Sequence, residues 1–266
     1  MSLELLSGRV CLVTGSSSGI GEAVARRAAQ MGARVVLNAR RAERLEALAA
    51  ELNQGGGTPR VMCVAGDAAD DAVVKAMFDR SLDVFGAEPD AVIVNAGRGL
   101  RGSILDSNAS EWEEMIRTNL LGAAKLMREA ATRMLAKLDA SKAGGEAWVK
   151  TPRDIVLLGS SVGRHISPFS SMYGSTKFAL HSLGEALRRE IGPKGIRVCV
   201  IEPAVVKSEF QDAAGYDPAV FGAFMEKIGP VLEPPDIADL IGSILSLPAR
   251  VNIADVVIRP TRQDYP

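Results

Sequence analysis

The chain alternates short apolar runs with longer amphipathic patterns from one end to the other, and this alternation constrains the fold most strongly. The runs typical of strands are Arg9–Thr14, Arg34–Asn38, Arg60–Ala65, Ala91–Val94, Ile155–Leu158, Ile196–Ile201 and Ala254–Ile258. The patterns typical of helices are Gly19–Met31, Arg41–Leu52, Asp70–Phe85, Ser110–Leu138, Met172–Ile191 and Pro235–Leu245. Strands that alternate with helices form a parallel sheet covered on both faces. We therefore expect a doubly wound α/β fold, with a binding crevice beyond the carboxyl ends of its strands.

No change of composition divides the chain, so we expect a single domain over residues 1–266. Two segments exceed what a minimal unit needs. Residues 139–151 are charged and contain Gly-Gly, which is typical of a surface insertion. Residues 207–234 are long and apolar, which favours a substrate loop, although a helix–turn unit that never touches substrate has the same pattern. The helix at Ser110–Leu138 is expected to begin with a capping box of Ser110 and Glu113.

The composition excludes several classes of partner. A formal net charge of −1 offers no basic surface for nucleic acid. No apolar run approaches the roughly 20 residues that cross a bilayer, and the first residues lack a signal-peptide pattern. The three cysteines, and the histidines His165 and His181, have no spacing typical of a disulfide framework, a metal site or a hydrolase triad. We expect a cytoplasmic protein without a metal, whose partner is a small molecule.

The segment Thr14–Gly21 joins the first expected strand to the first expected helix and contains three glycines. Gly15 permits a tight turn, Gly19 lets backbone N–H groups approach a pyrophosphate, and Gly21 lets the helix pack closely on the sheet. The phosphates would then meet the positive end of the helix. Glycines also occur in such turns for shape alone, but their place in the first strand–helix turn favours a dinucleotide site.

The end of the second expected strand selects between the two nicotinamide dinucleotides. An acid there would bind the ribose of NAD, but this chain has Asn38, Ala39, Arg40 and Arg41. Because a guanidinium pairs with a 2′-phosphate, the sequence predicts NADP(H), with Arg40 as its reader. The alternative is that both arginines are solvated residues of the next helix.

Tyr173 and Lys177 are one turn apart at the start of a helix, so they share a face. An ammonium beside a phenol lowers its pKa from about 10, which suits proton exchange with a substrate oxygen. Ser160 follows the preceding strand, where its hydroxyl would steady an oxyanion. Ser161 would serve as well, or both hydroxyls would only cap the turn.

These elements, with Asn95-Ala96-Gly97 and Asn119, resemble the short-chain dehydrogenase/reductase family over essentially the whole chain. The resemblance implies a Rossmann-type fold in which Tyr173 is the acid–base and Lys177 holds the nicotinamide ribose. Ser160, rather than Ser161, would bind the substrate oxygen, and Asn119 would anchor a water. The implied cofactor contacts are Gly15, Ser17, Ser18, Gly19, Ile20, Gly21, Arg40, Asp67, Ala68, Asn95, Ala96, Gly97, Tyr173, Lys177, Pro203, Val206 and Ser208.

The chain departs from the family pattern in three places. Ala204 stands where glycine is usual, and Ser208 stands where threonine is usual. Residues 139–151 are longer than the usual connection and follow a helix that the family uses for dimerisation. The resemblance implies a homodimer or homotetramer, with the insertion able to alter that assembly.

The stretch from Leu247 to Gln263 resembles the NADP-dependent serine/3-hydroxy acid dehydrogenase branch. We therefore expect hydride transfer that interconverts a secondary alcohol or hydroxy acid and its carbonyl. Arg98 and Arg101 would meet a substrate carboxylate or sulfonate, or else face solvent. The aromatic residues from Phe210 to Phe224 favour instead a bulkier apolar ketone or aldehyde. A dinucleotide sensor without turnover and a lyase or epimerase with bound cofactor remain alternatives.

Overall fold

Seven parallel strands form one sheet in the order β3-β2-β1-β4-β5-β6-β7. The computed structural model describes residues 4–54, 58–140 and 147–264. The strands are β1 (Val10–Thr14), β2 (Arg34–Ala39), β3 (Val61–Ala65), β4 (Ala91–Val94), β5 (Asp154–Leu158), β6 (Arg197–Pro203) and β7 (Asp255–Ile258). The fold class expected from the alternating pattern is confirmed.

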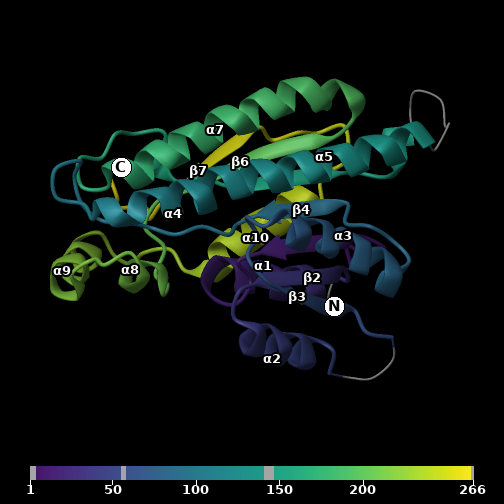
Figure 1. Ribbon diagram of the computed structural model, residues 1–266, viewed down its shortest axis with the longest axis horizontal. Helices are drawn as coiled ribbons and strands as arrows, with labels where there is room; N and C mark the ends of the chain where they lie inside the picture. The colour runs from purple at the N-terminus through teal and green to yellow at the C-terminus, as the bar shows by residue number, and fades with distance from the viewer. Residues whose placement is uncertain (1–3, 55–57, 141–146, 265–266) are drawn as a thin grey trace.

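Helices cover both faces of this sheet (Figure 1). One face carries α1 (Gly19–Gln30), α2 (Ala42–Leu52) and α10 (Pro234–Leu245), and the other carries α3 (Asp71–Phe85), α5 (Ala123–Ala140) and α7 (Ser171–Ile191). Successive residues of a strand point to opposite faces, so Cys11 and Val13 join one core while Leu12 joins the other. Because β1, β5 and β6 are buried along their whole length, they read as continuous apolar runs rather than alternating ones.

The helix expected at Ser110–Leu138 is interrupted. The chain forms a 3-10 turn η1 (Ala109–Glu111), then α4 (Trp112–Ile116), a π-helical segment η2 (Arg117–Gly122) and finally α5. The predicted N-cap is wrong, because Asn108 Oδ1 accepts from the Ser110 backbone N–H at 3.2 Å and from its hydroxyl at 2.8 Å. Asn108 begins the turn two residues earlier, so Ser110 becomes a donor inside it and has no capping box with Glu113.

The strand order reverses between β1 and β4, so the loops that follow these strands diverge and leave a crevice at the carboxyl edge. Residues 207–234 lie beyond this edge and form α8 (Phe210–Ala213) and α9 (Pro218–Ile228), at the left of Figure 1. The segment 139–151 contains the end of α5 and a helical turn α6 (Ala147–Lys150), and its residues 141–146 lie outside the described ranges. None of the described helices has the length and apolar character needed to cross a membrane.

Candidate active site

The turn between β1 and α1 is built on close backbone approach. Gly15 has a φ of +67°, and a Cβ placed on it would lie 2.8 Å from the side-chain nitrogen of Asn95. A Cβ on Gly21 would lie 2.3 Å from the Gly15 carbonyl oxygen, so only glycine lets α1 start this close to the strand. Asn95 Nδ2 donates to the Thr14 carbonyl oxygen at 2.8 Å, which ties the end of β4 to the turn. Ser18 precedes α1 and makes no side-chain capping bond, so the first N–H groups of the helix remain available to an anion.

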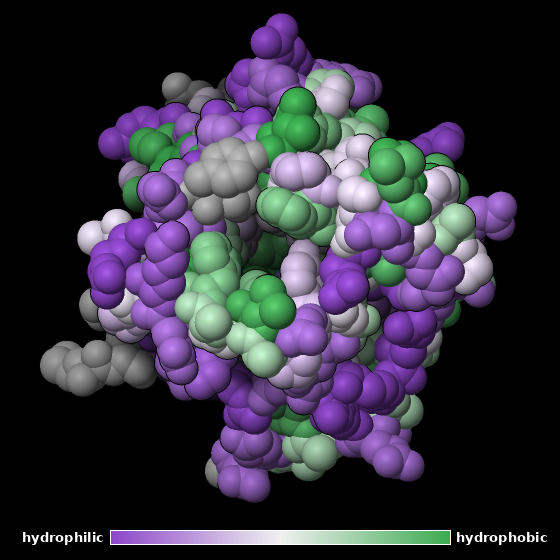
Figure 2. Space-filling view, turned by 90° about the vertical axis from the view of Figure 1, so that its left-hand side faces the viewer, coloured by the Kyte–Doolittle hydropathy of each residue, from purple (hydrophilic) through white to green (hydrophobic). Residues whose placement is uncertain are grey.

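A cavity of about 1330 Å³ opens at the carboxyl edge of the sheet. Its mouth is the hollow in Figure 2, which looks onto this end of the molecule. Its volume exceeds the roughly 300–1,000 Å³ of a typical ligand pocket, as a dinucleotide together with a substrate would require. The predicted site residues that line it are Gly15, Ser17, Ser18, Gly19, Ile20, Arg40, Asp67, Ala68, Asn95, Ala96, Gly97, Ser160, Tyr173, Lys177, Pro203, Val206 and Ser208.

Gly21 and Asn119 are predicted site residues that do not line the cavity. Gly21 packs against the turn behind it, as its predicted packing role requires. Among the residues that the structure describes, no group of three or more His, Cys, Asp or Glu side chains is arranged to hold a metal ion.

Two arginines border the end of the cavity where a ribose 2′ group would lie. Arg40 is exposed and lines the cavity, and its contact with a cofactor stays a prediction. Sequence reasoning did not assign a role to Arg41, whose guanidinium donates to Ser17 Oγ at 2.9 Å and to Ser18 Oγ at 2.7 Å. Its position next to Arg40, just before α2, was the only signal in the sequence.

Tyr173 and Lys177 enter the cavity from α7, and Ser160 enters from the turn after β5. Burial raises the pKa of Tyr173, and a hydrogen bond with Ser160 acts in the opposite direction. This is not the lowered pKa expected from the neighbouring ammonium. Lys177 Nζ instead donates to the Leu158 carbonyl oxygen at 2.6 Å and lies 5.7 Å from the centre of the Tyr173 ring. Ser160, and not Ser161, is the serine whose hydroxyl reaches Tyr173.

Asn119 lies in the π-helical segment and is almost fully buried. Its Oδ1 accepts from the Arg98 backbone N–H at 2.8 Å, and its Nδ2 donates to the Arg98 carbonyl oxygen at 2.8 Å and to Thr176 Oγ1 at 3.1 Å. The amide therefore joins the loop after β4 to α7. Its role in anchoring a water stays a prediction.

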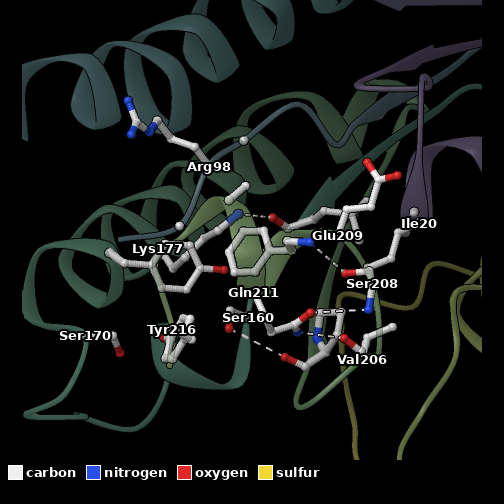
Figure 3. A pocket seen from close by; sticks show the side chains of 18 of the residues that line it. Ile20, Arg98, Ser160, Ser170, Lys177, Val206, Ser208, Glu209, Gln211 and Tyr216 are labelled. Carbon is white, nitrogen blue, oxygen red and sulfur yellow. Dashed lines mark hydrogen bonds between the residues drawn. The ribbon is translucent and has the colours of Figure 1, made fainter. Parts of the chain in front are cut away.

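The loop after β6 is fixed by a residue that sequence reasoning did not single out. Gln211 Nε2 donates to the Val206 carbonyl oxygen at 2.8 Å, and its Oε1 accepts from the Ser208 backbone N–H at 3.2 Å (Figure 3). Ser208 Oγ in turn accepts from the Phe210 backbone N–H at 3.3 Å. These bonds hold the predicted cofactor residues Val206 and Ser208 against the cavity and start α8 beside them.

Stability should depend on pH through Lys177, whose pKa is lowered by burial from 10.5 to about 8. Below pH 8 this lysine is protonated in both the folded and the unfolded chain, so the folded state carries the full cost of a buried charge. As the pH rises from 8 to 10.5 the folded chain binds fewer protons than the unfolded one, so stability increases. We expect the wild type to gain up to about 3 kcal/mol over that window relative to Lys177→Met, measured by urea unfolding without cofactor. A stability difference that does not change across the window would contradict the buried charge.

The comparisons with known proteins show the family of the chain. Residues 9–218 match the family model described as short chain dehydrogenase. The chain belongs to the short-chain dehydrogenase family. An uncharacterized oxidoreductase of Staphylococcus epidermidis is 32% identical over 252 residues, covering 95% of this chain and 97% of that protein.

Solved structures of other short-chain dehydrogenases share the fold. Serine dehydrogenase in its closed form with NADP+ has a TM-score of 0.83 at 27% identity, covering 96% of each chain. A 3-ketoacyl-(acyl-carrier-protein) reductase from Brucella melitensis with NADH has a TM-score of 0.82 at 24% identity, covering 97% of this chain and 99% of that one. This chain is accordingly an oxidoreductase of the short-chain dehydrogenase type, whose solved neighbours include proteins with either dinucleotide.

Proposed function

We propose that this protein is an NADP(H)-dependent oxidoreductase that interconverts an alcohol or hydroxy acid and the corresponding carbonyl compound, with Tyr173 as the acid–base. The observation that carries the proposal is the convergence of Ser160, Tyr173 and Lys177 on the same cavity that the glycine turn lines. The glycine turn follows β1 in one half of the sheet, whereas Ser160 and Tyr173 follow β5 in the other half. The reversal of strand order between β1 and β4 therefore places them side by side.

The residues of the cavity have separate tasks in this reaction. A bound nicotinamide would exchange a hydride with the carbonyl carbon. Tyr173 gives its proton to the carbonyl oxygen during reduction and takes it back during oxidation, while the Ser160 hydroxyl donates a hydrogen bond to the same oxygen. A phenol keeps its proton at neutral pH, and burial, which raises the pKa of Tyr173, acts in the same direction, so the group is ready to act as the acid. Lys177 holds a positive charge behind the Tyr173 ring.

The loss of NADPH absorbance across a panel of aldehydes, 2- and 3-oxo acids and bulky ketones tests the proposed activity. Steady consumption with any of them supports an oxidoreductase. Dinucleotide binding without consumption would favour the sensor, and turnover of a substrate without net consumption would favour the lyase or epimerase. Both the phenol and the ammonium that hydride transfer needs are present in the cavity, which favours the first outcome.

NADPH should be preferred over NADH by about ten- to a hundred-fold in kcat/KM, since a charge-assisted pair with a 2′-phosphate contributes about 1.5–3 kcal/mol. Arg40 and Arg41 stand at this position, and residue 39 is Ala rather than an acid. Glu209 also lines the cavity here, but it pairs with Arg41 at 3.4 Å and with Arg44 at 3.1 Å. Ala39→Asp with Arg40→Leu should reverse the order, mainly through KM. Arg60→Leu is the matched control, because Arg60 precedes the amino end of β3, away from the cavity. It should leave the preference between the two dinucleotides unchanged. Equal use of both dinucleotides by the wild type would contradict the assignment.

We propose that the protein assembles through a two-fold interface formed by α7 and by η2, the segment before α5. Apolar side chains of Leu121, Phe178 and Leu183 are exposed there, although each would gain from burial. Light scattering at micromolar concentration should give a dimer or tetramer, and Leu183→Glu should shift it toward the monomer. A monomeric wild type would contradict this interface and direct attention to residues 139–151. The single domain and the cytoplasmic location remain predictions from the sequence.

A further inference from the structure

The outer part of the cavity is an aromatic wall. The segment before α7, the helices α8 and α9 and the turn between them form this surface. The aromatic wall consists of Phe169, Phe210, Tyr216, Val220, Phe221 and Phe224. The rings continue outward from the acid–base, because the Phe210 ring centre lies 5.5 Å from that of Tyr173. The rings of Tyr216 and Phe221 are 5.3 Å apart, and those of Phe221 and Phe224 are 6.2 Å apart. Phe169 is 75% exposed and Val220 is 72% exposed, so apolar surface faces the cavity without a partner from the described chain.

The charges near this wall are already compensated. Arg98 forms an ion pair with Glu111, and its guanidinium points away from Lys177 and Ser160 in Figure 3. Arg101 lines the cavity and interacts electrostatically with both Asp106 and Asp217, which line it as well. A substrate carboxylate would therefore meet two carboxylates for one guanidinium.

We propose that the substrate is an uncharged carbonyl compound with an aromatic or bulky apolar group that packs on the aromatic wall. This rests on the proposed function and replaces the small hydroxy acid as its substrate class. The carbonyl carbon receives the hydride of a reduced nicotinamide dinucleotide, and its oxygen receives the Tyr173 proton. The products are the alcohol and the oxidised dinucleotide, and Tyr173 regains its proton from water.

Two compounds that differ in charge and by one methyl group test the substrate class, namely methyl para-acetylbenzoate and para-acetylbenzoate. With NADPH and the full chain, kcat/KM for the ester should exceed that for the carboxylate by about tenfold or more. Phe221→Ala should lower kcat/KM for the ester by about tenfold while leaving butanal within about twofold. Leu82→Ala, an exposed apolar residue of α3, is the control and should change neither.

Equal or better use of the carboxylate would overturn the substrate class and leave the proposed function intact. Absence of turnover with every carbonyl would overturn the proposed function instead. In that case the binding of the two compounds tests whether the aromatic wall is a binding site. In the presence of NADP+ the ester should raise the Tm more than the carboxylate does, and an ester that fails to raise it overturns the aromatic wall as a binding site.

A separate observation concerns His181, which lies behind the turn that carries Ser160. A Cβ on Gly159 would lie 2.2 Å from His181 Nε2, and a Cβ on Gly163 would lie 2.5 Å from its Cε1. A side chain at either position would overlap the imidazole, so the ring fits here because both residues are glycine. Its Nε2 accepts the backbone N–H of Ser160 at 3.3 Å.

The other ring nitrogen of His181 faces a buried carboxylate. Nδ1 lies 3.9 Å from Glu202 Oε1, and the Glu202 side chain is 2% exposed. Arg164 binds both oxygens of Glu202 at 2.7 Å and also pairs with Asp255, so the carboxylate is held in place. An acceptor at Nε2 requires the ring proton at Nδ1, where Glu202 favours it. Burial lowers the pKa of His181, which keeps the ring neutral at pH 7; Glu202 and Asp255 act in the opposite direction, and Lys177 and Arg164 in the same one.

We infer that His181 is a positioning residue, which sets the place of the Ser160 hydroxyl through the Ser160 backbone N–H. His181→Leu removes the acceptor at similar volume and should lower kcat about tenfold without changing the Kd for NADPH. His181→Gln keeps an acceptor and should restore kcat to within about threefold. In the wild type, protonation of the ring removes the acceptor, and the lowered pKa of His181 places this change on the acid side of the ordinary histidine value of 6.5. There kcat should fall, and this fall should be absent in His181→Gln.

An unchanged kcat in His181→Leu, or an equal loss in both variants with intact circular dichroism, would overturn the positioning role. If the leucine variant does not fold, Glu202→Gln supplies the second readout. Its amide no longer favours the proton at Nδ1, so kcat should fall with the Kd for NADPH unchanged. An unchanged kcat in that variant would also overturn the role.

Discussion

Replacement of Tyr173 by Phe should lower kcat by at least about 100-fold, the lower end of what a positioned acid–base contributes. The loss is large because the phenol is the only hydroxyl that both lines the cavity and bonds Ser160 in the described chain. The Kd for NADPH should stay nearly constant, since the change removes one oxygen and little contact surface. Single-turnover kinetics with a reactive carbonyl, together with NADPH fluorescence titration, measures the two quantities.

Ser175→Ala provides the control for this variant. Ser175 is an exposed residue of the same helix, and its hydroxyl only donates to the Ser171 carbonyl oxygen at 2.9 Å. It should leave kcat and cofactor affinity unchanged. If Tyr173→Phe kept more than about a tenth of kcat, equivalent to a barrier increase of only ~1.4 kcal/mol, the assigned acid–base role would be wrong.

Replacement of Asp154 by Ala should lower the free energy of unfolding by about 3–5 kcal/mol, because it leaves the buried Arg197 guanidinium without a carboxylate and leaves Arg9 with Asp90 alone. Asp154 begins β5 at the edge of the sheet opposite the cavity and is 2% exposed. Arg9 donates to its Oδ2 at 2.8 Å, and Arg197 donates to Oδ1 at 2.7 Å and to Oδ2 at 3.0 Å. The carboxylate thus joins the start of β5 to the start of its neighbour β6 and to Arg9, which precedes β1 on the other side of β4. Urea unfolding at fixed protein concentration measures the loss.

The same substitution at Asp239 is the matched control. Asp239 pairs with Arg27 on the surface, where both side chains are largely exposed. Its replacement by Ala should cost less than about 1 kcal/mol, since water screens such a pair. Equal losses at the two positions would show that burial of the Asp154 cluster contributes nothing beyond an ordinary ion pair.

The local pattern of the sequence predicted the layers of the molecule because the spacing of apolar residues is a property of adjacent positions. Apart from the interrupted helix at Ser110–Leu138, the strand runs and helix patterns were recovered to within a few residues, including the end of α3 at Phe85 and the start of β4 at Ala91. Two site features were also local. Gly15 and Gly21 are required by backbone approach within one turn, and the spacing of Tyr173 and Lys177 places both on one face of α7.

The tertiary structure decided what depends on residues far apart in the chain. Arg41 reaches the glycine turn 23 or 24 positions earlier, and Arg98 is neutralised by Glu111 from another element. Neither pairing has a periodic signal. The side chain of Asn119 is bound at three points because a π-helical segment turns it toward Arg98 and Thr176.

The direction of the Tyr173 pKa shift shows most directly how the expectation from the sequence differs from the outcome in the folded protein. The sequence places an ammonium one turn away and so predicts a lowered value. In the fold, the surrounding elements bury the phenol and the Leu158 carbonyl oxygen binds the ammonium, so desolvation outweighs the neighbouring charge. The sequence determined which groups share a helix face, whereas only the packed structure determined how much water they keep and which partner each one takes.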